Sequence, residues 1–272
     1  MPIKADYHVH SYFSGDSNAP MEQMVQTAIQ KGLSHLCFTE HMDFNFPYQS
    51  FDKPDMFFVN TDSYLYELLT LKEKYRSQIE LHFGIELGMQ ASVLRENLIY
   101  SRSYEFDFII ASSHLCNGRD PYYPDFYEGR SEEEAYREYF TSILESIKSF
   151  HNFDVYGHLD YVVRYGPNKD KNYSYEAYKD ILDAILMHLI ENEKGIEINT
   201  GGLSKGLQDV HPCTSILKRY RELGGEIITI GSDSHSPENL GAHFDKAAEI
   251  LTACDFKYYC VFANRVAEYF RL

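Results

Sequence analysis

The chain has few of the features that mark secreted, membrane or nucleic-acid-binding proteins. Its five cysteines are odd in number and form no Cys-x-x-Cys pair, so we expect reduced, mostly buried thiols in a cytoplasmic protein. No apolar run approaches the ~20 residues that a bilayer-spanning helix needs, and the first residues do not resemble a signal peptide. Acidic residues outnumber basic ones 41 to 25, and the net charge of −16 argues against a nucleic-acid partner.

Repeats, low-complexity tracts and flexible linkers are also lacking, which favours a single domain over residues 1–272. Short apolar runs alternate with segments of helical periodicity. The runs span 3–8, 34–39, 79–86, 106–112, 153–157, 195–199 and 226–231, and the helical segments span 20–31, 64–76, 131–150, 174–194, 212–223 and 237–253. This alternation predicts an α/β fold with a parallel sheet. At this length we expect a TIM-like barrel, because no glycine-rich dinucleotide loop follows the first run.

Two long segments without helix or strand periodicity are rich in aromatic residues. They span residues 41–61 and 116–130, and their aromatic side chains include Phe44, Phe46, Tyr48, Phe51, Tyr122, Tyr123, Phe126 and Tyr127. Long ordered loops in compact domains are usually functional. Both follow predicted strands at the same end of the barrel, so they either wall a substrate pocket or pack on themselves as insertions.

Histidines and carboxylates gather at the ends of the predicted strands. Nine residues of metal-binding type lie at or just past the carboxyl ends of the runs: His8, His10, Asp16, His41, Glu86, His114, His158, Asp233 and His235. In a barrel these strand ends converge on one rim, so residues far apart in the sequence become neighbours. The i, i+2 spacing of His8 and His10, and of Asp233 and His235, directs each pair toward one cavity.

Imidazoles mixed with carboxylates suit Zn²⁺, Mn²⁺ or Fe²⁺. Nine ligands are too many for one ion, so with a bridging carboxylate we expect two or three divalent ions. The remaining histidines are interpreted as ordinary hydrogen-bonded core or surface residues: His35, His82, His151, His188, His211 and His243.

Sequence segments spread over nearly the whole chain resemble one known family. These segments are DYHVHSYFSGD, FTEH, GIELG, SSHLCNG, YGHLDYV, IEINTGG and GSDSHSPENLG, and they are similar to the polymerase-and-histidinol-phosphatase (PHP) superfamily. The GHLD and NTGGL segments, with the run CTSILKRYRELGGEIITIGSDSH, resemble its histidinol-phosphate phosphatase branch. The resemblance implies a distorted (β/α)₇ barrel with a trinuclear metal site. It also implies hydrolysis of L-histidinol phosphate to L-histidinol and phosphate, a step of histidine biosynthesis.

The resemblance further implies roles for individual residues. His8, His10, Glu86 and Asp233 would hold one ion, Glu86 would bridge to a second held by His114 and His158, and Asp16, His41 and His235 would hold the third. Asp16 stands where many relatives carry histidine, and aspartate there is similar to the phosphatase branch. Asp16, Asp233 and His235 are also expected to take part in catalysis.

The expected reaction follows from such a site. Two ions about 3.5–4 Å apart can share a hydroxide, which would attack phosphorus in line with the leaving alkoxide. The ions would neutralise charge on the phosphoryl oxygens, which is most of what phosphoryl transfer requires. Arg164 aligns with a phosphate-binding arginine of the family. At a second such position this chain has Ser204 followed by Lys205: either Lys205 binds phosphate as a point charge, or the second contact is lost.

Three carboxylates are candidates for protonating the leaving alkoxide: Asp16, Glu40 and Asp160. Glu40 and Asp160 are equally able to orient metal-binding imidazoles, and for Asp160 we favour that role. Acidic and aromatic residues of the two long loops would receive the amine and imidazole of the substrate.

Two other functions fit parts of the pattern. A PHP-type phosphodiesterase or exonuclease acting on nucleotides or nucleic acid would need lysines and arginines around an open cleft, and such clusters are few. A metal-stabilised binding module without turnover would have no open coordination position. Phosphate release from an aryl phosphate, with and without chelator, separates the module from an enzyme.

Overall fold

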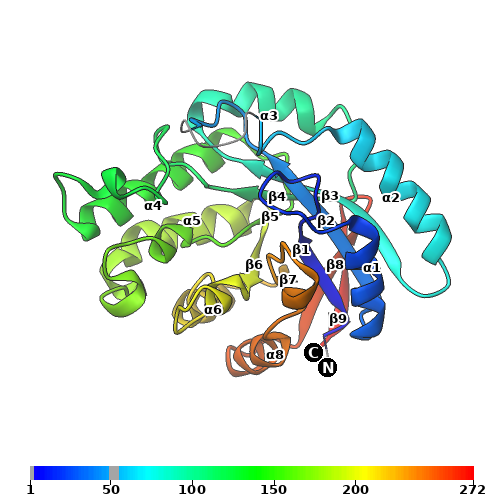
Figure 1. The fold of residues 1–272 in the computed structure, drawn as a ribbon. Coiled ribbons are helices and arrows are strands. Elements are labelled where there is room, and N and C mark those ends of the chain that lie inside the picture. The colour runs from blue at the N-terminus through cyan, green and yellow to red at the C-terminus, as the bar shows by residue number, and fades with distance from the viewer. Residues whose placement is uncertain (1–2, 49–54) are drawn as a thin grey trace.

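The structure is a computed structural model that describes residues 3–48 and 55–272. Within these ranges one parallel sheet contains β1 (Ala5–Val9), β2 (His35–Met42), β3 (Glu80–Gly88), β4 (Phe108–Ser112), β5 (Val155–Tyr156), β6 (Gly195–Asn199) and β7 (Ile228–Gly231), in chain order. Each strand overlaps one of the seven predicted runs, and β1, β2 and β3 extend one to three residues beyond theirs. Because every strand pairs in parallel with the next, the connections cross the outer face of the sheet, where the helices lie (Figure 1).

The barrel closes irregularly between β1 and the segment that follows β7. The Asp6 carboxylate accepts hydrogen bonds from the Ser232 amide at 3.0 Å, the Ser232 hydroxyl at 2.5 Å and the Gly241 amide at 3.0 Å. The Asp233 amide donates to the His8 carbonyl at 2.9 Å. A regular strand ladder is thus replaced at this seam by a buried side chain and a few backbone bonds. The predicted distorted (β/α)₇ barrel is confirmed.

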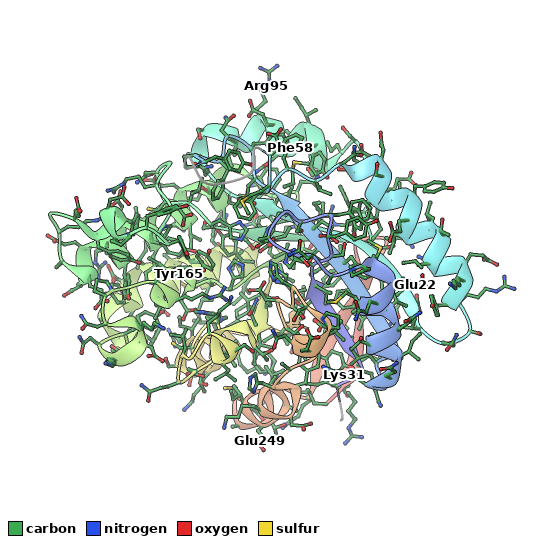
Figure 2. The ribbon with its side chains drawn as sticks, viewed as in Figure 1. Glu22, Lys31, Phe58, Arg95, Tyr165 and Glu249 are labelled. Atoms are coloured by element: carbon green, nitrogen blue, oxygen red, sulfur yellow. The ribbon has the colours of Figure 1, made fainter. Side chains whose placement is uncertain are left out.

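Helices surround the sheet. They are α1 (Met21–Gln30), α2 (Thr61–Tyr75), α3 (Leu94–Ser101), α4 (Glu132–Ser149), α5 (Lys179–Glu191), α6 (Gly201–Ser204), α7 (Thr214–Glu222) and α8 (Phe244–Ala253). Short 3₁₀ turns are η1 (Ala91–Val93), η2 (Pro124–Tyr127), η3 (Tyr161–Arg164), η4 (Lys169–Lys171), η5 (Tyr175–Tyr178) and η6 (Pro237–Asn239). Charged side chains such as Glu22, Arg95 and Glu249 lie on the outside of this ring (Figure 2).

One predicted helix differs from the structure. The segment 237–253 was expected to be a single helix, but η6 occupies its start and α8 begins only at Phe244. His243 between them has a left-handed φ of +61°, which a continuous helix does not permit. No helix within residues 3–48 and 55–272 combines the length and the apolar character needed to cross a bilayer.

A hairpin that the periodicity did not predict covers the amino-terminal end of the barrel. It consists of β8 (Tyr258–Ala263) and β9 (Val266–Arg271), paired antiparallel. The Tyr7 hydroxyl donates to the Phe262 carbonyl at 2.8 Å, and the Asn264 amide donates to Asp107 Oδ1 at 3.0 Å. With this end covered, the opposite end, where the strands terminate, remains for a functional site.

Candidate metal centre

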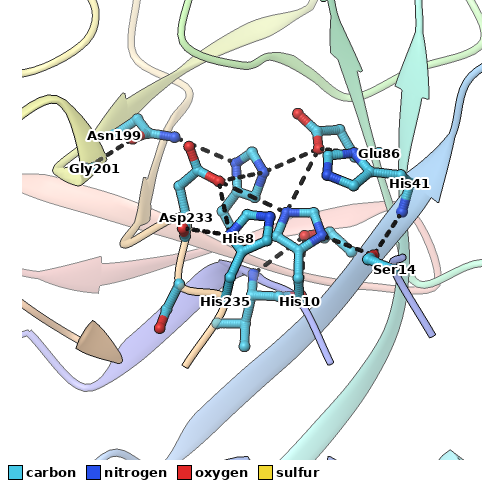
Figure 3. A network of polar contacts seen from close by, with 12 residues as sticks. His8, His10, Ser14, His41, Glu86, Asn199, Gly201, Asp233 and His235 are labelled. Carbon is cyan, nitrogen blue, oxygen red and sulfur yellow. Dashed lines mark hydrogen bonds and ion pairs between the residues drawn. The ribbon is translucent and has the colours of Figure 1, made fainter. Parts of the chain in front are cut away.

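The nine predicted residues lie together at the carboxyl end of the barrel. They come from β1, β2 and β3 and from the segments that follow β1, β4, β5 and β7. Figure 3 shows part of this cluster, with imidazoles and carboxylates pointing toward a common centre. Asp233 adopts a left-handed φ of +54°, a conformation that few residues other than glycine, asparagine and aspartate take. The turn after β7 therefore brings its carboxylate back over the rim.

Glu86 lies at the middle of the cluster, and its two oxygens face different imidazoles. Oε1 is 2.8 Å from His158 Nε2 and 3.2 Å from His114 Nε2. Oε2 is 3.3 Å from His8 Nε2 and 3.6 Å from His10 Nε2. This is the arrangement expected of a carboxylate that bridges two cations.

Asp233 joins the group that His8 and His10 form around Glu86 Oε2. Its Oδ1 lies 3.7 Å from His10 Nε2 and 3.8 Å from His8 Nε2. The expected set of His8, His10, Glu86 and Asp233 is thus brought together around one point.

Asp16 forms a third group with two histidines. Its Oδ2 is 3.0 Å from His235 Nε2 and 3.6 Å from His41 Nε2. The His10 ring stacks between them, with its centroid 4.2 Å from that of His235 and 4.3 Å from that of His41. The other nitrogen of His41 is 3.0 Å from Glu86 Oε2, so this group adjoins the other two.

Orphaned polar atoms show that the cluster fits cations. The buried atoms without a hydrogen-bond partner include His8 Nε2, His10 Nε2, His41 Nδ1, His235 Nε2 and Glu86 Oε2. Each such atom costs about 1–3 kcal/mol when it is left unsatisfied. Five of them converging on one buried space are explained by cations that accept electron pairs from imidazole and carboxylate.

Charges within the cluster support the same interpretation. Burial raises the pKa of Glu86, but His8, His114 and His41 together lower it by more. The resulting pKa is well below the usual value. For Asp16, burial is likewise outweighed by His41 and His235, and its pKa is also well below normal. Both carboxylates stay ionised, and Glu86 does so while it is fully buried, which is costly unless cations compensate it.

Two buried carboxylates that the sequence analysis missed orient histidines of the centre. Glu197 Oε1 is 2.7 Å from His8 Nδ1, and Asp43 Oδ1 is 2.9 Å from His114 Nδ1. In both cases the other ring nitrogen, Nε2, faces Glu86. Gly88 makes room for Asp43, because a side chain at this glycine would collide with the Asp43 carboxylate.

Glu40 orients its neighbours through serines. Its carboxylate accepts from the Ser14 hydroxyl at 2.5 Å and from the Ser11 hydroxyl at 2.5 Å. Ser14 Oγ is in turn 3.1 Å from His10 Nδ1 (Figure 3). Burial raises the pKa of Glu40 to about 7, even though the hydrogen bonds from Ser11 and Ser14 lower it.

Asp160 does not have the expected role of orienting a histidine of the centre. Its Oδ1 is 2.5 Å from His211 Nδ1, and its Oδ2 accepts from the Cys213 amide at 2.9 Å. His211 lies outside the nine-residue cluster. Asp160 therefore joins the start of η3 to the segment that precedes α7.

A cavity of about 450 Å³ opens above the cluster. Its lining includes Asp16, His41, His114, His158, Asp233 and His235 from the cluster, and Phe46, Met56, Phe57, Asp120, Tyr122 and Tyr123 from the two long loops. Phe126 and Tyr127 are instead buried in the core, and Phe51 lies outside the described residues. Both loops thus contribute pocket walls, although only part of their aromatic residues does so.

The cavity also contains the predicted phosphate-binding residues. Arg164, Ser204 and Lys205 all line it. Arg164 is only 7% exposed, its Nη2 is 3.2 Å from Asp233 Oδ2, and its Nε has no hydrogen-bond partner. Burial lowers the pKa of Arg164, but Asp233 and two tyrosines raise it by more. The pKa is therefore raised overall, and the guanidinium stays charged.

Comparisons with known proteins agree with this geometry. The chain is 35% identical over 262 residues to the histidinol-phosphatase of Lactococcus lactis subsp. lactis, covering 96% of this chain and 95% of that protein. It is 34% identical over 252 residues to a probable histidinol-phosphatase of Clostridium acetobutylicum, covering 93% and 94%.

Solved structures give the same result. The crystal structure of the Lactococcus lactis histidinol phosphate phosphatase, complexed with zinc, L-histidinol and phosphate, superimposes with a TM-score of 0.86 at 34% identity, covering 97% of this chain and 98% of that chain. A putative histidinol phosphatase of Listeria monocytogenes shares the fold, with a TM-score of 0.77 at 22% identity, covering 89% and 99%. The PHP domain family matches residues 6–201, well over half of the sequence. The chain therefore belongs to the PHP domain family.

Proposed function

We propose that this protein is a metal-dependent phosphomonoesterase that hydrolyses L-histidinol phosphate to L-histidinol and phosphate. The observation that carries the proposal is the position of Glu86 between two groups of imidazoles, next to a cavity that is lined by His114, His158 and the buried Arg164. The Lactococcus lactis relative, which holds zinc, L-histidinol and phosphate, supports both the substrate and the metal.

The proposed ligands are the nine residues of the cluster. His8, His10, Glu86 and Asp233 would hold one divalent ion, Glu86 with His114 and His158 a second, and Asp16, His41 and His235 a third. Zn²⁺, Mn²⁺ and Fe²⁺ all fit this mixture of nitrogen and oxygen donors. When bound, such ions acidify water toward a pKa of ~7 and stabilise negative charge on phosphoryl oxygens.

The chain's own residues bind and orient the phosphate. Arg164 presents its guanidinium to the cavity, while its contact with Asp233 Oδ2 at 3.2 Å fixes the side chain. A planar guanidinium donates two parallel hydrogen bonds to phosphate oxygens. Lys205 lines the same cavity, and we propose it as the second cationic contact, with Ser204 beside it as a hydrogen-bond donor.

Among the three carboxylates considered as proton donors, Asp16 is the one that lines the cavity. Glu40 is buried against Ser11 and Ser14, and Asp160 is buried against His211. The pKa of Asp16 is well below its usual value, so its carboxylate is ionised and does not itself supply the proton. We propose Asp16, Asp233 and His235 as the catalytic residues, because all three line the cavity and would hold the ions that act on the phosphate. His235 Nε2 lies 3.0 Å from Asp16 Oδ2, so the two side chains face the same point of the cavity.

The walls of the cavity suit the organic part of this substrate. Phe46, Phe57 and Tyr122 offer ring faces, and Asp120 offers a carboxylate. A protonated amine pairs with a carboxylate and also binds over aromatic faces. We propose that residues 1–272 act as one hydrolase domain and that the protein works in the cytoplasm, in histidine biosynthesis.

Phosphate release tests the proposal. The enzyme, loaded with Mn²⁺ or Zn²⁺, is assayed with L-histidinol phosphate, with several nucleotides and with a phosphodiester. We expect kcat/KM for L-histidinol phosphate to exceed the other values by at least about a hundredfold, because buried polar groups discriminate strongly against substrates that leave them unpaired. Equal slow rates on all substrates would refute L-histidinol phosphate as the substrate and leave a metal-dependent hydrolase. A preference for the diester would favour the phosphodiesterase alternative.

A further inference from the structure

Three residues at the opposite end of the barrel form a second cluster of metal-binding type, which we call the barrel-base site (His35, Glu80 and His82). His35 begins β2, and Glu80 begins β3 two residues before His82. The register pairs His35 with Glu80 and Cys37 with His82, so the three side chains share one face of the sheet. Since His35 and His41 are six residues apart on one strand, about 20 Å separates this site from the metal centre.

The distances within the barrel-base site fit a single small ion. His35 Nδ1 is 3.3 Å from His82 Nε2. Glu80 Oε2 is 3.7 Å from His35 Nδ1, and Glu80 Oε1 is 3.9 Å from His82 Nε2. Ligand atoms around tetrahedral zinc, with bonds of about 2.0–2.1 Å, lie roughly 3.3–3.4 Å apart. The imidazoles already have this spacing, and the carboxylate, 57% exposed, has room to close the small remaining gap.

The two imidazoles are in the protonation state that binds metal. Burial lowers the pKa of His82 to about 4, against the opposing effect of Asp107. Burial also lowers the pKa of His35, although Glu80 and Glu268 act in the other direction. Both rings are therefore neutral near pH 7, so each has one ring nitrogen that can bind metal. The proton in the hydrogen bond between His35 Nδ1 and His82 Nε2 would move to the other nitrogen of its ring when an ion binds.

Packing holds the histidines and leaves one side accessible. Phe270 of β9 meets the His35 ring edge-on at a centroid distance of 5.1 Å, and Tyr7 packs against His82 at 5.4 Å. The His82 side chain is 2% exposed, whereas Glu80 faces solvent. An ion can thus enter past Glu80 without unfolding of the barrel, and water can complete its coordination.

We propose that His35, Glu80 and His82 bind one divalent transition-metal ion, with zinc the best fit to two imidazoles and one carboxylate at this spacing. The ion would join the first residues of β2 and β3 beneath the β8–β9 hairpin. At this distance from the cavity it would stabilise the fold and leave the reacting groups untouched. The site is independent of the proposed phosphatase activity.

Metal counting on the whole chain tests this site. Wild type, His35→Gln, Glu80→Gln and the control His151→Gln are equilibrated with excess Zn²⁺, desalted and analysed by elemental mass spectrometry. His151 is an exposed histidine whose ring neighbours His188. We expect wild type and the control each to retain one more zinc ion per chain than His35→Gln retains. We also expect their melting temperatures to rise further on zinc addition than that of His35→Gln.

Glu80→Gln provides a second variant that keeps both imidazoles and changes only an exposed side chain. We expect it to bind the additional zinc ion at least about tenfold more weakly, because a neutral amide is a poorer ligand for zinc than a carboxylate. Both variants should retain the wild-type rate of phosphate release, which shows that they fold. Equal zinc content and an equal thermal response in wild type and both variants would overturn the site and leave an ordinary histidine–histidine hydrogen bond.

Discussion

At the scale of single residues, the metal centre depends on the hydrogen bonds behind its imidazoles. Glu197 holds His8 by Nδ1, and Asp43 holds His114 by Nδ1, so that Nε2 of each ring faces Glu86. Such partners fix the tautomer and orientation of a ligand, and they raise its basicity. The candidate centre therefore has a second layer of carboxylates behind its proposed ligands.

Replacing Glu197 tests this layer. Glu197→Gln removes the charge behind His8 and keeps the shape of the side chain. We expect metal affinity or kcat/KM to fall about 10–100-fold, the usual effect of losing such a partner. Titration of the metal-free protein with Mn²⁺ measures the affinity, with the exposed Glu191→Gln on α5 as control. Wild-type affinity and activity in Glu197→Gln would contradict the role of this layer.

Mutation of Arg164 tests the proposed phosphate-binding residue directly. Arg164→Ala should raise KM for phosphate monoesters about 10–100-fold, the range for a lost hydrogen bond to a charged group, with a smaller effect on kcat. Arg164→Lys retains the charge and should recover only part of the loss, because it lacks the planar fork. Steady-state kinetics give KM and kcat for wild type and the two variants. Unchanged KM in both would show that Arg164 only compensates Asp233.

The sequence predicted nine candidate ligands because histidines and carboxylates repeat at the ends of apolar runs, and the structure brings all nine together at one end of the barrel. Glu197 and Asp43 were missed, because Glu197 lies inside a predicted strand and Asp43 inside a predicted loop. A signal was present for both. Glu197 is a charged residue inside an apolar strand, and Asp43 lies two residues beyond His41. A buried carboxylate without an evident cation is itself a sign of a histidine or metal partner.

At the scale of elements, alternation of apolar runs and helical segments was enough to predict β1 to β7, because each of these strands is buried on both faces. It was not enough for the β8–β9 hairpin. Its turn residues Asn264 and Arg265 have φ of +49° and +65°. A turn of this kind usually has glycine at its second position, so arginine there concealed it.

The seam between β1 and β7 has a predictable energetic role. Asp6→Ala leaves the amides of Ser232 and Gly241 without their acceptor, and each unsatisfied buried group costs about 1–3 kcal/mol. We therefore expect the free energy of unfolding to fall by at least about 2 kcal/mol, measured by urea denaturation of the metal-loaded protein. Glu249→Gln, on the exposed face of α8, serves as control and should leave stability almost unchanged. Equal stability of wild type and Asp6→Ala would show that the seam does not depend on this carboxylate.

At the scale of the whole molecule, a protein with a net charge of −16 is proposed to bind a doubly charged anion. The local field resolves this conflict: Arg164 and Lys205 line the cavity, and divalent ions held by the cluster would add further positive charge. The acidic surface then opposes binding of larger polyanions without preventing entry of a small phosphate ester.

Removal of metal should affect both activity and stability. Chelation is expected to abolish phosphate release and to lower the melting temperature, because the buried carboxylates lose their compensating cations. One ion at a hundredfold excess over its Kd contributes about 2.7 kcal/mol. This corresponds to a shift of roughly 5 °C or more in a protein of this size. Activity that survives exhaustive chelation, with the melting temperature unchanged, would contradict a metal-dependent enzyme.

The most direct test of the account is to locate the ions. A crystal of the zinc- or manganese-loaded protein, measured on both sides of the metal absorption edge, gives anomalous peaks only where ions are bound. We predict two or three peaks at the carboxyl end of the barrel: one beside Glu86 Oε2 and Asp233, one beside Glu86 Oε1 and, where a third ion is bound, one beside Asp16. A single peak at this end, or peaks there at which Glu86 coordinates no ion, would contradict the central claim that one bridging carboxylate organises the site.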